Sequence, residues 1–350
     1  KISLYFRCCC CQTCCCGKPT KADYILNDNC CQCNVVALKK ISGLPDMDLV
    51  YVTYHVDIGE TPFFVAVDNK YKKIVICVRG TLSLQDVLTD LKADAEILPL
   101  DPVREDWVGH KGMVQAAIYI KKKLKEDMIL NKAFQKAKEQ SSEKYELVLV
   151  GHSLGAGAAA ILAILLQQEY QDVHYECMQA TKSFITSVVV GKDVVPRIGL
   201  PQMELLRTDL INIIKKSSNP KWKIIMKALC CGTQSASGMT YEEMQEASQR
   251  DVTAHPSDDQ IGLTAHNPMY PPGRIILVVR NHVHGKKRCC GEREPVYQAI
   301  WADNSDFQEV LVSPTMVNDH MPDNVLDALE KVEGNLKLGN DNAYMYAFVI

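Results

Sequence analysis

The sequence has no long apolar run. None of its hydrophobic stretches reaches the roughly 18–20 residues that a membrane-spanning helix needs, so we expect no segment of it to cross a bilayer by itself. An excess of one charge is also missing. Lys and Arg number 39 against 42 Asp and Glu, and the formal net charge of −3 argues against nucleic acid as the main partner. The start of the chain, at Lys1, shows no charged and then apolar signal sequence.

The amino-acid composition is typical of a globular protein. Hydrophobic residues make up 47% and charged residues 23% of the chain, which excludes a disordered or fibrous protein. A length of 350 residues is enough for one large domain or two smaller ones, with a buried core.

Cysteines are abundant, and most of them cluster near the start of the sequence. Of 16 cysteines, ten lie within the first 33 residues, and four of them are consecutive, from Cys8 to Cys11. A disulfide framework would spread its cysteines through the fold, and consecutive cysteines do not pair with each other in ordinary geometry. The Cys11-x-x-Cys14 spacing leaves a zinc site open, although no matching Cys or His pair follows. We favour S-acylation of these cysteines on a membrane-facing cytosolic surface.

Short apolar runs alternate with helical patterns, which predicts an α/β fold with a mostly parallel sheet covered by helices. We divide the chain into a Cys-rich, membrane-proximal lead (1–40), a main domain (41–335) and a C-terminal tail (336–350). A polar insertion without a core pattern lies at about 232–272, before a late strand. The predicted strands are 49–56, 62–67, 74–78, 147–150, 184–190, 275–279 and 296–301, and the predicted helices are 112–126, 154–169, 201–216 and 322–332.

A nucleophile motif follows the strand at 147–150. The sequence runs into Gly151-His152-Ser153-Leu154-Gly155 and then into a helix of small residues, which is the G-x-S-x-G elbow in its strand–turn–helix setting. The turn is tight, so side chains two residues before and after the serine would collide. The helix directs the unpaired N–H groups of its first turn at the site, where they favour negative charge. The motif predicts that Ser153 is a nucleophile in an α/β-hydrolase fold.

A serine nucleophile needs a base that an acid orients, and in this architecture the acid and then the base follow it along the chain. Asp193 stands just past the strand at 184–190, where such an acid belongs. His320 lies in the loop before the final helix, which is the expected place of the base. The other downstream histidines lie in the insertion or in a basic turn and are the alternatives: His255, His266, His282 and His284.

The oxyanion of an acyl-transfer reaction needs two N–H donors. One candidate is the amide of Leu154, directly after the nucleophile. The second is Thr81, in the turn Arg79-Gly80-Thr81 that follows the strand at 74–78. A Gly-Thr turn is equally a plain helix cap, so both interpretations stay open.

A basic and apolar segment occupies residues 212–232. It holds five lysines around Trp222 and several aliphatic residues, and it ends at Cys230 and Cys231. Interfacial segments combine such residues, and each cation near an anionic leaflet contributes about 1 kcal/mol. A core helix with a solvated lysine face is the alternative. We hypothesise that this segment and the Cys-rich lead dock the domain on a cytosolic leaflet with anionic lipids.

Several motifs resemble the class 3 lipase family: GHSLGAG at 151–157, VRGT at 78–81 and LTDL at 88–91. Others are similar to the sn-1-specific diacylglycerol lipases, nearer the alpha than the beta form: HKGM at 110–113, GKDVVPRIG at 191–199, YPPGRII at 270–276 and DHMP at 319–322. The resemblance implies a serine hydrolase without an organic cofactor. It would cleave the sn-1 ester of diacylglycerol to a 2-monoacylglycerol, such as 2-arachidonoylglycerol, and a free fatty acid. The implied triad is Ser153, Asp193 and His320.

The resemblance also implies a multi-pass plasma-membrane protein with a cytosolic catalytic domain, of which this chain would be a part. It implies calcium dependence, although the sequence shows no acidic cluster like a calcium loop. In one place the chain departs from the family, whose members have a further strand after the elbow helix. Here the residues for that strand are missing around Cys177, so we expect an open sheet beside the active site. The alternatives are therefore a lipase or phospholipase A1 of other head-group preference, or a catalytically impaired membrane-bound scaffold.

Overall fold

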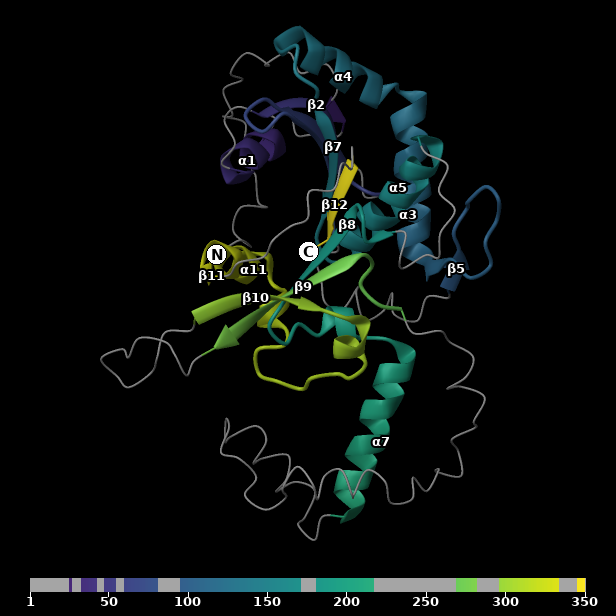
Figure 1. Cartoon of the computed structure of the whole chain (residues 1–350), viewed down its shortest axis with the longest axis vertical. Coiled ribbons are helices and arrows are strands. Elements are labelled where there is room, and N and C mark those ends of the chain that lie inside the picture. The colour runs from purple at the N-terminus through teal and green to yellow at the C-terminus, as the bar shows by residue number, and fades with distance from the viewer. Residues whose placement is uncertain are drawn as a thin grey trace, which may run out of the picture. The chain divides into compact units, whose positions relative to one another are not determined.

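The computed structural model describes residues 25–26, 33–42, 47–54, 60–80, 95–170, 181–216, 269–281, 296–333 and 345–349 (Figure 1). The chain forms two compact units. The first unit comprises Lys1–Gly191, Pro271–Asp303 and Pro322–Ile350, and the second comprises Lys192–Tyr270 and Asn304–Met321. The chain therefore leaves the first unit twice and returns to it twice.

A mixed sheet, with ten strands among the described residues, forms the basis of the first unit. Strands β4, β7, β12, β8 and β9 run parallel at its centre, whereas β2–β3–β4 and β9–β10 are antiparallel. The predicted mostly parallel sheet is confirmed there. In spatial order the strands are β1 (Ile25–Leu26), β2 (Met47–Thr53), β3 (Phe63–Asp68), β4 (Lys73–Val78), β7 (Glu146–Gly151), β12 (Met345–Val349), β8 (Ile185–Val190), β9 (Arg274–Asn281), β10 (Val296–Ala302) and β11 (Val332–Glu333).

Helices cover this sheet on both sides. Figure 1 shows α1 on one side and α3 and α5 on the other. A separate hairpin, β5 (Ala95–Ile97) and β6 (Val108–His110), precedes α3. The described helices of this unit are α1 (Cys33–Ser42), α3 (Lys111–Glu126), α4 (Ile129–Gln140), α5 (Leu154–Tyr170) and α11 (Pro322–Glu330).

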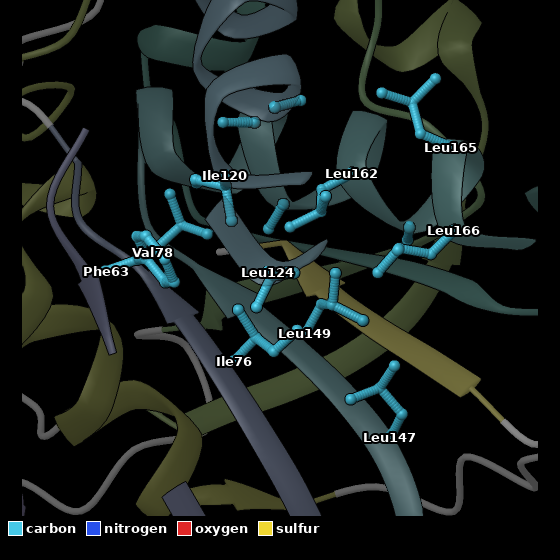
Figure 2. Close-up of a cluster of buried hydrophobic side chains, with 14 of the residues drawn as sticks. Phe63, Ile76, Val78, Ile120, Leu124, Leu147, Leu149, Leu162, Leu165 and Leu166 are labelled. Atoms are coloured by element: carbon cyan, nitrogen blue, oxygen red, sulfur yellow. The ribbon is translucent and has the colours of Figure 1, made fainter. Parts of the chain in front are cut away.

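The main core lies between the centre of the sheet and α3 and α5 (Figure 2). Ile120 and Leu124 lie on the apolar face of α3, four residues apart, and are buried against side chains such as Ile76 of β4 and Leu149 of β7. Helix α5 carries alanines along its buried length, so it can approach both α3 and the sheet closely. Full burial of each large aliphatic side chain contributes about 1.5–3 kcal/mol.

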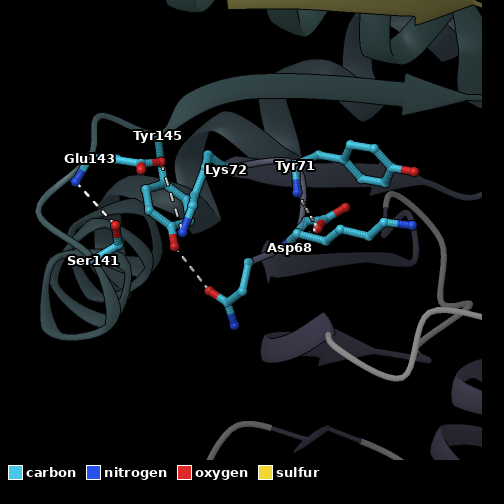
Figure 3. Close-up of polar contacts among 8 residues, drawn as sticks. Asp68, Tyr71, Lys72, Ser141, Glu143 and Tyr145 are labelled. Atoms are coloured by element: carbon cyan, nitrogen blue, oxygen red, sulfur yellow. Dashed lines mark hydrogen bonds and ion pairs between the residues drawn. The ribbon is translucent and has the colours of Figure 1, made fainter.

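A polar cluster fixes the turn between β3 and β4 (Figure 3). The Asp68 carboxylate accepts hydrogen bonds from the backbone N–H groups of Lys70 and Tyr71, at 2.9 and 3.0 Å. Lys72, in a left-handed conformation with φ of 54°, contacts the ring of Tyr145 at the entry to β7. These contacts lie where β4 begins, and β4 then pairs with β3 and β7 without a break as far as Val78. The end of β4 is therefore held in a fixed position beside the elbow.

The position between β7 and β8 is filled by β12, from the far end of the chain. Five residues of β12 pair with β7 and three pair with β8, in parallel on both sides. Helix α5 packs on β12 as well as on β7. The sequence led us to expect an open sheet here, and the structure corrects that expectation. The segment 336–350, which we had assigned as a tail, thus supplies a central strand.

The described residues of the second unit form helix α7 (Leu200–Lys216) and the short 3-10 turns η2 (Val195–Arg197), η3 (Asn304–Phe307) and η4 (Asn318–His320). Within the described parts of the chain, no helix is both long and apolar enough to cross a membrane. Most of the Cys-rich lead, most of the insertion at 232–272, and the part of the basic segment beyond α7 lie outside the described residues.

Candidate active site

Ser153 occupies the turn between β7 and α5. Its φ of 58° lies in the left-handed region, which costs a residue with a side chain about 1 kcal/mol or more. The turn can form because its neighbours are glycines. A Cβ on Gly155 would lie 2.6 Å from the carbonyl oxygens of Val78 and Arg79, and one on Gly151 would collide with the backbone of Gly155. The predicted elbow is therefore present, at the end of a central parallel strand.

The surroundings of Ser153 suit a nucleophile. The residue is 8% exposed, and its Oγ has no hydrogen-bond partner among the described residues of the first unit. Leu154 begins α5, so its N–H belongs to the first turn, whose N–H groups lack partners within the helix. A Cβ on Gly80 would lie 3.4 Å from the Cβ of Ser153. This places the end of β4 beside the nucleophile, whereas Thr81 itself lies outside the described residues.

Helix α3 also reaches the elbow. The thioether of Met113 packs against Gly157 in the first turn of α5, where a Cβ would collide with its sulfur. His110, immediately before α3, is 7% exposed. Both residues belong to the motif at 110–113, and the contact of Met113 with Gly157 places one end of that motif beside the elbow.

The second unit brings Asp193 and His320 together. The His320 Nδ1 and the Asp193 Oδ2 lie 2.9 Å apart, and both side chains are buried. The other oxygen of Asp193 accepts a hydrogen bond from the backbone N–H of Val195, also at 2.9 Å. When Nδ1 of a neutral imidazole donates to a carboxylate, the proton lies on Nδ1 and Nε2 is a proton acceptor. This tautomer is the one that a general base requires.

Arg197 lies close to this pair. It is 3% exposed, donates to the backbone carbonyl of Asp306, and stacks on the Phe307 ring with 4.7 Å between the guanidinium carbon and the ring centroid. Burial lowers the pKa of the Arg197 guanidinium, and the carboxylates of Asp193 and Asp306 act in the opposite direction. A buried cation therefore lies within electrostatic reach of the acid. Arg197 lies within the motif at 191–199, which by itself indicates no role for it.

The predicted site residues are thus divided between the two units. Ser153 and Leu154 belong to the first unit, and Asp193 and His320 to the second. The alternative bases lie outside the described residues: His255, His266, His282 and His284. The described residues contain no cluster of three or more His, Cys, Asp or Glu side chains that could hold a metal ion.

A serine held in a left-handed turn between a central parallel strand and its covering helix defines an α/β-hydrolase fold with the elbow of a serine hydrolase. Residues 75–179 match the family described as lipase (class 3). The chain is 44% identical over 330 residues to diacylglycerol lipase-alpha of Rattus norvegicus and of Homo sapiens. These matches cover 90% of this chain and 32% of each relative.

Diacylglycerol lipase-beta of Mus musculus is 36% identical over 330 residues, covering 86% of this chain and 48% of the relative. The chain therefore contains a class 3 lipase domain and is homologous to the diacylglycerol lipases, which confirms the predicted resemblance. It spans about a third of the alpha relatives' length and about half of the beta relative's length.

Two solved structures are also similar to the chain. The nonglycosylated Yarrowia lipolytica LIP2 lipase matches with a TM-score of 0.37 and 20% identity, covering 45% of this chain and 64% of that one. The mono- and diacylglycerol lipase from Aspergillus oryzae matches with a TM-score of 0.37 and 23% identity, covering 49% of this chain and 64% of that one.

Proposed function

We propose that this chain is a serine lipase that hydrolyses the sn-1 ester of diacylglycerol to a 2-monoacylglycerol and a free fatty acid. The observation that carries the proposal is the strained elbow at Ser153, in a chain 44% identical to diacylglycerol lipase-alpha. The buried Asp193–His320 pair supports it, since it supplies an oriented base of the kind that a serine nucleophile needs.

In the proposed reaction, the Ser153 Oγ attacks the sn-1 carbonyl carbon while Nε2 of His320 takes the serine proton. Asp193 keeps Nδ1 protonated and stabilises the imidazolium that forms. The amide of Leu154 and a donor from the turn at Arg79–Thr81 hold the oxyanion. The imidazolium gives its proton to the departing glycerol oxygen, which leaves an acyl-enzyme. Water, deprotonated by His320, then releases the fatty acid and restores Ser153.

The structure bears on the alternative of an impaired scaffold. That alternative arose because a missing strand would open the sheet beside the elbow. Since β12 pairs with both β7 and β8, the strand that carries the elbow is enclosed on both sides. An intact sheet favours an active enzyme over a scaffold.

The substrate class also requires a lipid surface, and we propose that the chain acts on the cytosolic leaflet of the plasma membrane. Helix α7 supports this proposal, because Met203, Leu205 and Leu210 are each more than 40% exposed along it. The basic segment at 212–232 begins within the same helix. Flotation on vesicles with and without phosphatidylserine tests the proposal, using a variant whose five lysines in that segment are replaced by Gln. Equal flotation of both proteins on both vesicle types would contradict it.

A substrate panel tests the enzymatic proposal. Purified protein and its Ser153→Ala variant receive diacylglycerol, triacylglycerol and phosphatidylcholine with distinguishable acyl chains at sn-1 and sn-2. We expect release of the sn-1 acid from diacylglycerol at the highest rate, and no release by the variant. A preference for phosphatidylcholine would instead establish a phospholipase A1, and equal activity of the variant would refute the serine mechanism.

A further inference from the structure

Asp319 is a buried carboxylate that the proposed chemistry does not use. It is 1% exposed and directly precedes the base, His320. Its Oδ2 accepts two hydrogen bonds, from the backbone N–H of Lys192 at 2.9 Å and from the Oγ1 of Thr315 at 3.0 Å. Burial of an ionised carboxylate is costly unless such donors compensate it, so its presence here calls for an explanation.

The partners of Asp319 connect the two segments that carry the acid and the base. Lys192 directly precedes Asp193, just as Asp319 directly precedes His320. The two segments are therefore joined at two successive positions, by Lys192 with Asp319 and by Asp193 with His320. These segments lie more than 120 residues apart in the chain, and both belong to the second unit.

One further hydrogen bond joins the two segments, and another shapes the turn that carries His320. The backbone N–H of Val194 donates to the carbonyl of Met316 at 3.2 Å. Asp319 also donates its own N–H to the carbonyl of Thr315 at 2.7 Å, so the Asp319 carboxylate and the Thr315 hydroxyl are held on one short turn. That turn is the one that presents His320. A change at Asp319 should therefore alter the position of the His320 imidazole relative to the Asp193 carboxylate.

We propose that Asp319 is a positioning residue for the catalytic base. Its carboxylate holds the His320 turn against the Asp193 segment, so that Nδ1 stays within hydrogen-bond distance of the acid. As a role in catalysis, this inference rests on the proposed function. Hydrogen bonds to a charged acceptor are stronger than neutral ones. A displacement of about 1 Å in a reacting group can lower a rate by about 10²-fold, so a modest shift of the turn has a large kinetic effect.

Three variants and a control test the proposal. Asp319→Ala removes both acceptor contacts, Asp319→Asn keeps an oxygen that can accept them, and Thr315→Val removes one donor only. Glu309→Gln is the control, because it removes an exposed carboxylate of the same unit. We expect Asp319→Ala to lower kcat about 10²-fold with little change in KM, after normalisation to serines titrated by a fluorophosphonate. Asp319→Asn should recover much of this loss, Thr315→Val should show a smaller loss, and the control should match the wild type.

A spectroscopic readout keeps the proposal testable apart from lipid hydrolysis. The Nδ1 proton of a histidine hydrogen-bonded to a carboxylate gives a far-downfield proton NMR signal. We expect this signal in the wild type, in Asp319→Asn and in the control, and its loss in Asp319→Ala. A wild type that is inactive on every lipid but shows this pattern would refute the proposed function and support the positioning role. A wild-type signal and a normalised kcat that both persist in Asp319→Ala would overturn the positioning role.

Discussion

Deletion of residues 345–350 removes β12 and tests how far the elbow depends on the distant end of the chain. Five pairs with β7 and three with β8 would be lost, and both neighbours would gain an unpaired edge inside the sheet. At about 0.5–1.5 kcal/mol for each backbone hydrogen bond, the loss is on the order of 5 kcal/mol. Domains of this kind have total stabilities of only about 5–15 kcal/mol. We therefore expect the deletion to unfold the first unit or to leave it marginally stable.

Denaturant unfolding followed by circular dichroism measures this loss, and fluorophosphonate labelling reports whether Ser153 stays reactive. Ala347→Pro should act in the same direction as the deletion, because proline removes a backbone N–H from a central strand. Ala347→Gly is its matched control, since glycine keeps that N–H and costs only about 0.5–1 kcal/mol. A deletion variant with the wild-type midpoint and labelling rate would refute the role of β12.

Four other predictions concern the site and the core. Ser153→Ala should lower ester hydrolysis by about 10⁴-fold or more without changing the melting temperature by more than a few degrees, which steady-state kinetics and calorimetry measure. Asp193→Asn and His320→Ala should each be severely impaired, and neither should add much to the loss in Ser153→Ala, because triad members act as a unit; double-mutant kinetics check this. Gly155→Ala should abolish labelling of the serine, because its Cβ would lie 2.6 Å from the end of β4. Burial raises the pKa of Tyr51 from 10.0 to about 12, so the folded state favours the protonated phenol. The protonated Tyr51 therefore contributes its full stability below pH 10, and this contribution is lost as the pH rises towards 12. Tyr51→Phe should flatten this alkaline loss in a melting-temperature series.

Local patterns in the sequence predicted most of the elements around the elbow. The apolar runs at 74–78 and 147–150 lie in β4 and β7, the alternating run at 62–67 overlaps β3, and the helical pattern at 112–126 lies in α3. Each of these segments has one clear buried face, and that pattern is visible in the sequence itself. The charged stretch at 131–144 has no pattern that separates a continued helix from a loop. It forms a separate helix, α4, because Met128 adopts a left-handed conformation with φ of 49° and breaks the run.

Features that depend on distant contacts were not predictable. A five-residue apolar run such as β12 carries no local sign that it will enter the middle of a sheet between β7 and β8, which lie more than 150 residues earlier in the chain. Asp319 and Arg197 lie within the motifs at 319–322 and 191–199, but nothing in those motifs indicates that their charged side chains are buried. Their burial arises only when the segments near Asp193 and His320 meet. The pairing of Asp193 with His320 was predictable, because the order of triad members along the chain pointed to these two positions.

Active-site labelling with mass spectrometry tests the central claim, that Ser153, Asp193 and His320 act together as one catalytic triad. The full chain and its Asp193→Asn and His320→Ala variants react with a fluorophosphonate, and proteolytic peptides then identify the modified residue and its rate of modification. The account predicts that Ser153 alone is modified in the wild type, and that both variants slow this modification by several orders of magnitude. Modification of another residue, or wild-type rates at Ser153 in both variants, would contradict it.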